Sequence, residues 1–381
     1  MTADLQLERV STEPAFAELA AEWDDLVRAM PRPSPFLLHG WLLQWWRHFG
    51  GGAELAVLVA RRDGSLVGGL PLFVRSRHGI RVAEFLGGHE SALADLLLAP
   101  GEDLATAGEL ASRLVATPPV CDVADLYGLP SQSRLAAALM ASGKPLRLVL
   151  RSDAPVLDLT PGWRAVYTAK ISAKRRNLHR RRRRQLSELG TVETSVARSR
   201  ADLAVALERA FRLHELRWQD RPDRSTFATE RGRDFHRAAL RAVADLDVAR
   251  IVTLTLDGQP IAFHYYLLLE RRMYVHHLAY DPAYARLSPG LVTTYDALEA
   301  AAAEGATAVE FLGGPERYKL ELADRLEPLF EGLGLTSRAR GRALLVARLA
   351  ALEGRRRLKR SQTLRRLYYN PLVRSLGRAK T

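Results

Sequence analysis

The residues best suited to chemistry lie in the second half of the chain, at a turn that opens an expected helix. Arg286, Ser288, Pro289 and Gly290 stand there, directly before an apolar stretch. Ser is a preferred N-cap residue, Pro suits the first helical position, and Gly lets a ligand approach the backbone. A helix N-terminus offers unpaired N–H groups and the positive end of a dipole, so it attracts phosphate. The segment predicts a phosphate-binding turn, although an ordinary capped helix fits the same residues.

Two histidines and a tyrosine near this turn are candidates for acid–base chemistry. His276 and His277 are neighbours in an expected strand over 273–280, so we predict that they lie on opposite faces and that only one faces a cleft. His277 is the candidate base, although a packed or surface role fits either histidine. Tyr318 can protonate a leaving group and Lys319 can hold a phosphorylated acceptor, while a salt-bridged helix start explains the same pair.

Residue type and spacing exclude several other chemistries. Cys121 is the single cysteine, and no His and acid stand at a recognisable spacing around it, so covalent catalysis and a disulfide framework are excluded. The sequence shows no Walker loop, paired-carboxylate motif or clustered zinc ligands, and we predict no metal. Trp41, Trp45 and Trp46 can form a stacking platform for a sugar, but their helical spacing favours a place in the core.

The elements expected to hold these residues form two similar halves. In the first half, strands over 55–60 and 66–74 flank an Asp-Gly turn, and Pro71 predicts a bulge or an edge. In the second half, strands over 249–256 and 260–269 flank another Asp-Gly turn. A further strand, a helix and a strand that ends near glycine follow in each half. We therefore predict a mixed α/β (α+β) chain of two domains, each with a mostly antiparallel sheet flanked by helices.

Five motifs of this chain carry a resemblance to a known family. They are Trp41-x-x-x-Trp45-Trp46, the run 66–72, Lys174-Arg175-Arg176-Asn177, the run 280–290 and the run 310–319. Together they resemble the CelD-type (BioF2-like) acyltransferases of the GNAT superfamily. The layout, with two such domains in one chain, is also similar to the FemABX peptidyltransferases. The match runs from about Pro35 to Phe330 and is strongest from Tyr280 to Lys319.

The resemblance implies a fold of two tandem GNAT-like domains and an acyl group transferred from acetyl-CoA or another acyl-CoA, used as co-substrate, to an amine or hydroxyl. It implies that residues 286–290 bind the coenzyme, and that Glu310 orients the acceptor or acts as base. The expected acceptor is a small-molecule or lipid-linked sugar, a precursor of the cell envelope or of exopolysaccharide. Four segments are expected: an N-terminal GNAT-like domain (1–160), a basic connecting helix (161–190), a C-terminal catalytic GNAT-like domain (191–335) and a basic tail (336–381).

Basic charge is concentrated in two segments. The net charge is +13, but residues 338–381 carry 14 Lys or Arg and one acid, so residues 1–337 balance at 42 of each sign. Residues 170–184 hold nine basic side chains and no acid. Lys174, Arg175 and Arg176 in that segment can bind an anionic partner, or belong to a solvated helix between domains. The tail suits an anionic membrane surface, and we expect its removal after Gly334 to leave a folded body.

Two alternatives stay open at this point. A Fem-like peptidyltransferase would use aminoacyl-tRNA and bind it through the basic helix. A non-catalytic protein would bind membrane or nucleic acid through the tail. The sequence shows no apolar signal segment and no membrane-spanning stretch, so we expect a cytoplasmic enzyme with peripheral contact at the inner face of the membrane.

Overall fold

A computed structural model describes residues 4–114, 120–144, 146–219, 225–313, 316–334 and 339–360. The strands are β1 (Leu5–Val10), β2 (Ala53–Leu55), β3 (Val57–Arg62), β4 (Ser65–Leu70), β5 (Leu72–Arg77), β6 (Ile80–Phe85), β7 (Leu97–Leu98), β8 (Val123–Pro130), β9 (Arg147–Asp158), β10 (Val192–Ala197), β11 (Ala249–Leu256), β12 (Gln259–Leu269), β13 (Arg272–Tyr280), β14 (Ala308–Glu310) and β15 (Arg325–Gly334).

The α-helices are α1 (Glu13–Ala17), α2 (Ala20–Arg28), α3 (His39–Phe49), α4 (Leu104–Ser112), α5 (Arg134–Ala141), α6 (Trp163–Lys170), α7 (Ala173–Ser187), α8 (Arg200–Trp218), α9 (Glu230–Val243), α10 (Pro289–Ala303), α11 (Arg317–Leu322) and α12 (Ala339–Arg360). Short 3₁₀ turns connect them: η1 (Pro35–Leu37), η2 (Gly88–Glu90), η3 (Thr226–Ala228), η4 (Ala244–Leu246) and η5 (Pro282–Leu287).

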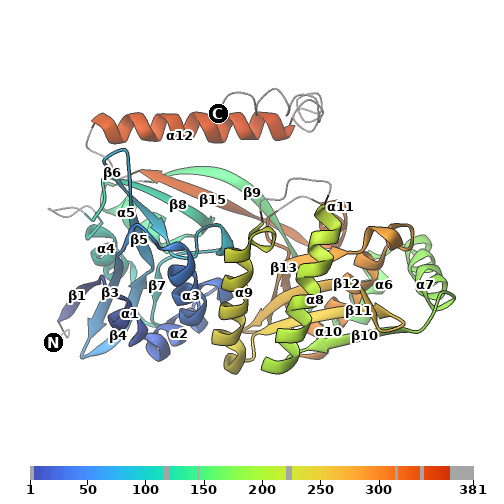
Figure 1. The fold of residues 1–381 in the computed structure, drawn as a ribbon. Coiled ribbons are helices and arrows are strands. Elements are labelled where there is room, and N and C mark those ends of the chain that lie inside the picture. The colour runs from blue at the N-terminus through green and yellow to red at the C-terminus, as the bar shows by residue number, and fades with distance from the viewer. Residues whose placement is uncertain are drawn as a thin grey trace.

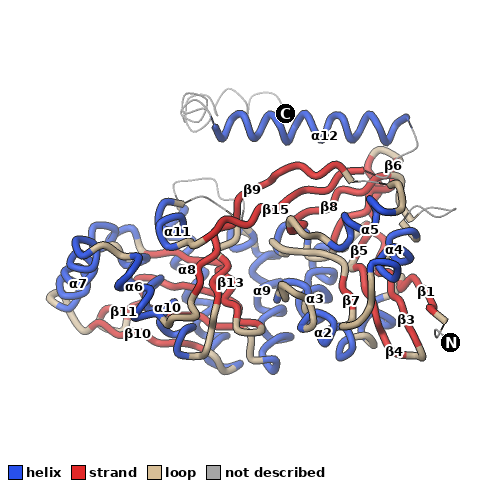
Figure 2. Tube along the Cα trace, turned by 180° about the vertical axis from the view of Figure 1, so that it is seen from behind, coloured by secondary structure: helices blue, strands red, loops and turns tan. Residues whose placement is uncertain are grey.

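One large sheet runs through both halves of the molecule (Figures 1 and 2). Its eleven strands lie in the order β10-β11-β12-β13-β14-β9-β15-β8-β6-β5-β2, and a second sheet of four strands has the order β1-β3-β4-β7. Neighbours are antiparallel except for β13 with β14 and β6 with β8. The predicted mixed, mostly antiparallel sheets flanked by helices are confirmed.

Strands β9 and β15 join the two halves. The end of β9 pairs with β14, whereas most of its length pairs with β15. Strand β15 follows the second half in sequence, yet it lies between β9 and β8 of the first half. Because these long-range pairs cross between the halves, neither half has a complete sheet without the other. The predicted domain boundaries stay a prediction.

Alternating residues of the second half bury opposite faces of the sheet. On β11, Ile251 packs into the cluster that contains α8 residues, whereas Val252 packs into the cluster that contains α10 residues. Helix α8 therefore covers one face and α10 the other, as the two-residue period of a strand requires. The free edge of β13 lies between these two helix layers.

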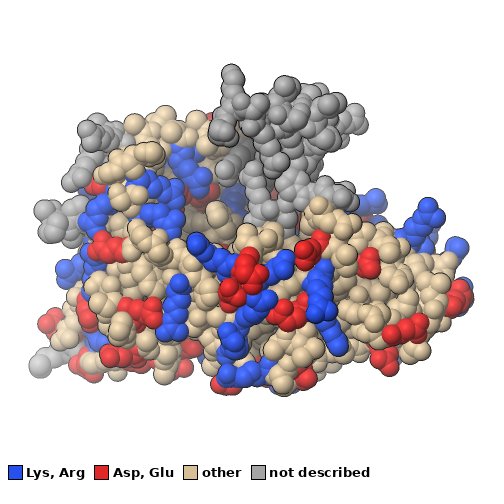
Figure 3. Space-filling model, viewed as in Figure 1, with Lys and Arg blue, Asp and Glu red and all other residues tan. Residues whose placement is uncertain are grey.

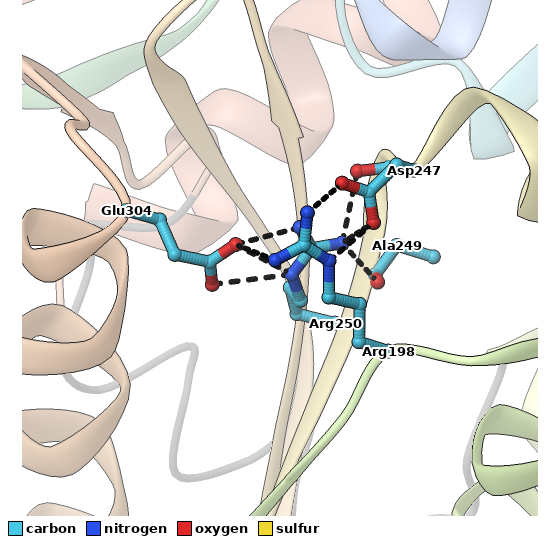
Figure 4. Close-up of polar contacts among 5 residues, drawn as sticks. All are labelled: Arg198, Asp247, Ala249, Arg250 and Glu304. Atoms are coloured by element: carbon cyan, nitrogen blue, oxygen red, sulfur yellow. Dashed lines mark hydrogen bonds and ion pairs between the residues drawn. The ribbon is translucent and has the colours of Figure 1, made fainter.

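A buried arginine fixes the C-terminal end of α10 to the sheet (Figure 4). Arg250 on β11 is 1% exposed, and its Nη2 donates to Glu304, the C-cap of α10, at 2.6 Å. Its Nη1 donates to the carbonyls of Asp247 and Ala249, each at 2.9 Å. All three nitrogens of the guanidinium, Nε, Nη1 and Nη2, thus donate to partners within the protein. The position of the α10 N-terminus follows from this anchor at the other end.

Pro71 separates two strands rather than bending one. The predicted strand over 66–74 is two strands, β4 and β5, which enter different sheets. Proline cannot donate to a ladder, so a change of sheet at this position leaves no donor unpaired. The predicted hairpin of the second half, β11 and β12 around an Asp-Gly turn, is confirmed.

The described part of the basic tail forms α12, which lies along the sheet of the first half (Figure 1). Arg348 donates from Nε to Asp125 at 2.9 Å and also pairs with Glu331. Leu344 and Leu345 pack against a small apolar cluster of β6 and β8. Charges of both signs are interspersed over the face seen in Figure 3, in line with the balanced body. Among the described residues, no helix is long and apolar enough to cross a membrane.

Candidate active site

A cavity of about 690 Å³ opens where β13 and β14 separate. The two strands pair only at Arg272–Tyr274 with Ala308–Glu310. Beyond this point, residues 275–280 line one wall of the cavity and residues 311–313 line another. The remaining walls come from η2, β8, β9, α8 and α11, so both halves of the chain contribute. The separation leaves the backbone groups along one edge of β13 facing a cavity instead of a partner strand.

A β-bulge at His276 turns two adjacent histidines into the same cavity. Tyr265 pairs with His277 and Tyr266 with Val275, so His276 is the extra residue on β13. Both histidines line the cavity and their rings are 4.4 Å apart. The prediction that they lie on opposite faces is wrong, because a bulge interrupts the alternation of a strand.

Four side chains from distant segments meet beside this bulge. Glu90 of η2, His236 of α9, His276 and His277 each offer a ligand atom within 4.8 Å of the others, and we call them the imidazole cluster. Nε2 of His236 lies 3.5 Å from Glu90 Oε2, and Nε2 of His276 lies 4.0 Å from it. A tetrahedral zinc ion separates its ligand atoms by about 3.4 Å, so the cluster is of a size that can hold such an ion. Sequence reasoning missed Glu90 and His236, because nothing in their spacing relates them to β13.

Burial determines the protonation of this cluster. Burial lowers the pKa of His276 to about 3, with the neighbouring His236 adding to the effect. The pKa of His277 is likewise well below its usual value, because of burial first and the nearby histidines second. Burial opposes the charge of Glu90, but contacts with His236 outweigh it and keep the pKa of that carboxyl below its usual value. The cavity wall therefore presents the neutral imidazoles of His276 and His277 close to the Glu90 carboxylate at neutral pH.

The predicted Tyr318 and Lys319 both line the cavity. Burial raises the pKa of Tyr318, so the phenol keeps its proton at neutral pH. Lys319 is 7% exposed, and its Nζ donates to the carbonyls of Phe311 at 3.3 Å and Gly313 at 3.2 Å. It also pairs with Glu316 at 2.9 Å. Lys319 thus holds the loop after β14 in shape, and much of its hydrogen-bonding capacity is used there.

The predicted Glu310 does not line the cavity. Its carboxylate is fully buried and accepts bonds from Arg32 at 3.0 and 2.7 Å and from Arg272 at 2.9 Å. Arg32 belongs to the segment between α2 and η1, so this pair of arginines, which we call the Glu310 clamp, connects the two halves. Both carboxylate oxygens are bonded to these arginines and neither faces the cavity, so Glu310 connects the two halves, and its predicted catalytic role stays a prediction.

The predicted phosphate turn lies next to the cavity, behind Tyr280. A Cβ added at Gly290 would meet the Tyr280 ring at 2.8 Å, and Tyr280 itself lines the cavity. Ser288 is the N-cap residue of α10, but its φ is +53° and its side chain makes no capping bond. The predicted N-cap position of Ser288 is confirmed, although its hydroxyl does not cap the helix. Arg286 lies in η5 and Pro289 begins α10.

The predicted anion-binding residues of the basic helix do not line the cavity. Arg175 pairs with Glu321 of α11, and Arg176 donates to the carbonyl of Thr168 at 2.8 Å. Lys174 is exposed. Helix α7 approaches η5 and α10 through its C-terminal part, where Leu186 packs with Val292 and Arg183 pairs with Asp296, whereas residues 174–176 lie at its other end.

Comparison with known proteins agrees with this geometry. Residues 173–320 match the acetyltransferase (GNAT) domain family. This segment is therefore similar to a GNAT acetyltransferase domain. It contains β13, the cavity wall and the start of α10, and the expectation of an acyltransferase is confirmed. No protein of curated function matches the sequence.

Solved structures share the fold of this chain over a longer stretch than residues 173–320. FemX aligns with a TM-score of 0.58 and 11% identity, over 87% of this chain and 97% of that chain. The C-terminal domain (DUF2156) of a proposed lysylphosphatidylglycerol synthetase from Agrobacterium fabrum aligns with a TM-score of 0.54 and 12% identity, over 88% and 96%. A tandem GNAT protein from the clavulanic acid biosynthesis pathway has a TM-score of 0.48 and 15% identity, over 88% and 100%. The alignments with FemX and the synthetase domain, each over most of both chains, confirm the predicted α/β fold class.

Proposed function

We propose that this GNAT protein transfers an acyl group from an acyl-CoA to an amine or hydroxyl of a small-molecule or lipid-linked sugar acceptor, as the CelD-type resemblance implies. The separation of β13 from β14 carries the proposal. It creates a cavity beside a strand edge whose backbone groups have no partner strand among the described residues. Such an edge can bind an extended, amide-containing arm in the way a further strand would.

The donor in this proposal enters from the α10 side. Its pantetheine arm follows the free edge of β13, and its pyrophosphate lies at Arg286 and the α10 N-terminus. Two observations support this orientation: Tyr280 borders both the cavity and Gly290, and Arg250 anchors α10 at its far end. A helix N-terminus attracts phosphate, so the start of α10 beside Tyr280 suits the pyrophosphate. Lys174, exposed at the N-terminal end of α7, stays the proposed contact for an anionic group.

The acceptor in this proposal meets the thioester at the imidazole cluster. The acceptor nitrogen or oxygen attacks the thioester carbonyl while His277 takes its proton. Glu90 stabilises the imidazolium that forms, since a carboxylate close to a cation lowers its energy. The tetrahedral oxyanion is stabilised by backbone N–H groups of the bulged strand. On collapse, the C–S bond breaks and Tyr318, which stays protonated, gives its proton to the leaving thiolate.

The test measures acetyl-CoA binding by calorimetry and release of free coenzyme A with a thiol reagent, over a panel of amino sugars and lipid-linked sugars. His277→Asn and Tyr318→Phe should lower turnover about 100-fold or more while keeping the affinity for acetyl-CoA. His78→Asn, at an exposed hairpin position, is the matched control. Folded wild-type protein that binds no acyl-CoA would overturn the proposal, and binding of aminoacyl-tRNA instead would favour the Fem-like alternative.

The remaining proposal concerns location. The exposed side of α12 and the basic residues that follow it can contact an anionic membrane while the other side packs on the sheet. This would bring the cavity close to a lipid-linked acceptor. Residues 361–381 lie outside the described residues.

A further inference from the structure

A second bulge, on β9, faces the same cavity. On β9, Ser152 pairs with Leu329 and Leu150 with Phe330, so Arg151 is the extra residue. Arg151 and Ser152 are adjacent, and both line the cavity. As at His276, the bulge interrupts the alternation of the strand and directs two neighbouring side chains to one side. Each bulge therefore adds a polar pair to the cavity.

The polar pair on β9 has unused donors. Nη1 of Arg151 and Oγ of Ser152 are buried, and neither has a hydrogen-bond partner among the described residues. Burial lowers the pKa of Arg151 to about 10, and the carboxylate of Glu331 only partly opposes this effect. Glu331 itself pairs with Arg348 of α12. Arg151 thus remains a cation in the cavity wall without a carboxylate within 4.0 Å in the described part of the chain.

The position of the guanidinium is fixed by stacking. Its carbon lies 3.7 Å from the centre of the Tyr127 ring, and Tyr127 is in turn held edge-on by His89 at 4.4 Å. Stacking holds the plane of a guanidinium while leaving its N–H edge available. Buried polar groups without partners are uncommon in folded proteins, and two adjacent donors in one cavity indicate a ligand that supplies acceptors.

The other charged groups of the cavity differ from Arg151 in what they already contact. Lys319 is occupied by two carbonyls and Glu316. Arg217 stacks on Tyr280, with its guanidinium carbon 4.7 Å from the ring centre, and so lies toward the proposed donor side. Glu90 is a carboxylate of the imidazole cluster and repels an anion. Arg151 is therefore the cation that can hold an anionic group away from the donor side.

We propose that Arg151 and Ser152 form a binding site for the anionic group of a substrate, a phosphate or a carboxylate. The guanidinium donates to one oxygen and the Ser152 hydroxyl to a second, which satisfies both unused donors. This inference rests on the proposed function for its biological meaning, since the anion belongs either to the acceptor or to the coenzyme. An acceptor held in this way would present its nucleophile across the cavity to the imidazole cluster.

The test titrates inorganic phosphate and then acetate into the full chain by calorimetry, with and without saturating acetyl-CoA. Arg151→Gln should weaken phosphate binding about tenfold or more, because a charge-assisted bond is lost. Ser152→Ala should weaken it by a smaller factor. Arg151→Lys keeps the charge but not the planar fork, so it should bind phosphate more tightly than Arg151→Gln and less tightly than wild type. Such partial recovery would show that the cavity is still folded in these variants. Arg231→Gln, at an exposed position of α9, is the matched control.

Each outcome has a defined meaning. Phosphate that still binds in the presence of acetyl-CoA assigns the site to the acceptor, and phosphate that is displaced assigns it to a coenzyme phosphate. Equal phosphate affinity in wild type and Arg151→Gln, or no phosphate binding by wild type, overturns the inference. Acetyl-CoA binding is measured on the same samples, so loss of the anion site with intact coenzyme binding leaves the proposed function standing.

Discussion

A substitution in the Glu310 clamp can distinguish a structural role of Glu310 from the catalytic role that the family resemblance implies. We consider Glu310→Gln, which removes the charge and keeps the shape. The carboxylate is fully buried, whereas the Arg32 and Arg272 side chains are 14% and 25% exposed. Removing one partner of a buried ion pair costs about 3–5 kcal/mol. We expect about 3 kcal/mol, the lower end, because both arginines reach water and Arg32 keeps Glu327 at 2.8 Å.

The matched control is Glu327→Gln, which removes the more exposed partner of the same arginine. Its side chain is 25% exposed, so we expect a loss of about 1 kcal/mol or less. Both values come from urea unfolding followed by circular dichroism at neutral pH, with turnover measured below the unfolding transition. A Glu310→Gln protein that unfolds like wild type but has lost turnover would refute the clamp and return Glu310 to the catalytic site.

Three further predictions concern protonation, metal binding and the tail. Burial lowers the pKa of His264 to about 3, so below pH 6.5 the unfolded chain binds a proton that the folded chain does not. The free energy of unfolding then falls by up to about 1.4 kcal/mol per pH unit for this group. Thermal unfolding between pH 7 and 5 should show a smaller loss of stability with falling pH in His264→Asn than in wild type, with His78→Asn as the control. Zinc should bind the imidazole cluster and inhibit acyl transfer, and a chelator should reverse the inhibition, whereas magnesium should not inhibit. His276→Gln should weaken the inhibition by zinc, and unchanged inhibition in this variant would contradict the assignment of the ligands. Arg348→Met should lower the free energy of unfolding by about 2 kcal/mol or more, because two buried carboxylates lose their shared cation, and a melting temperature equal to that of wild type would show that α12 does not stabilise the sheet.

The walls of the cavity come from both halves of the chain. Glu90 reaches the imidazole cluster from η2, and Arg151 lines the cavity from β9, while the histidine pair and Tyr318 come from the second half. Strand β15 passes between β9 and β8, so the first half cannot complete its sheet until the second half is present. Catalysis by residues 173–320 alone is therefore not expected, since this segment lacks the cavity residues of η2, β8 and β9.

The sequence by itself determined the classes of element and the kind of enzyme. Asp-Gly turns between apolar runs predicted the hairpins, and the run from Tyr280 to Lys319 indicated the acyltransferase domain. These signals are local, because turn chemistry, alternation and helix starts act over a few residues. Tyr318 was found in the same way, beside the end of β14.

Tertiary structure decided which side chains meet. The bulges at His276 and Arg151 arise from pairing with neighbouring strands, so the alternation assumed for an isolated strand misplaced one histidine and gave no sign of the Arg151 and Ser152 pair. Glu310 became a structural residue because Arg32, far away in sequence, folds onto it. Such long-range contacts carry no periodic or spacing signal along the chain, and only the folded sheet brings them together.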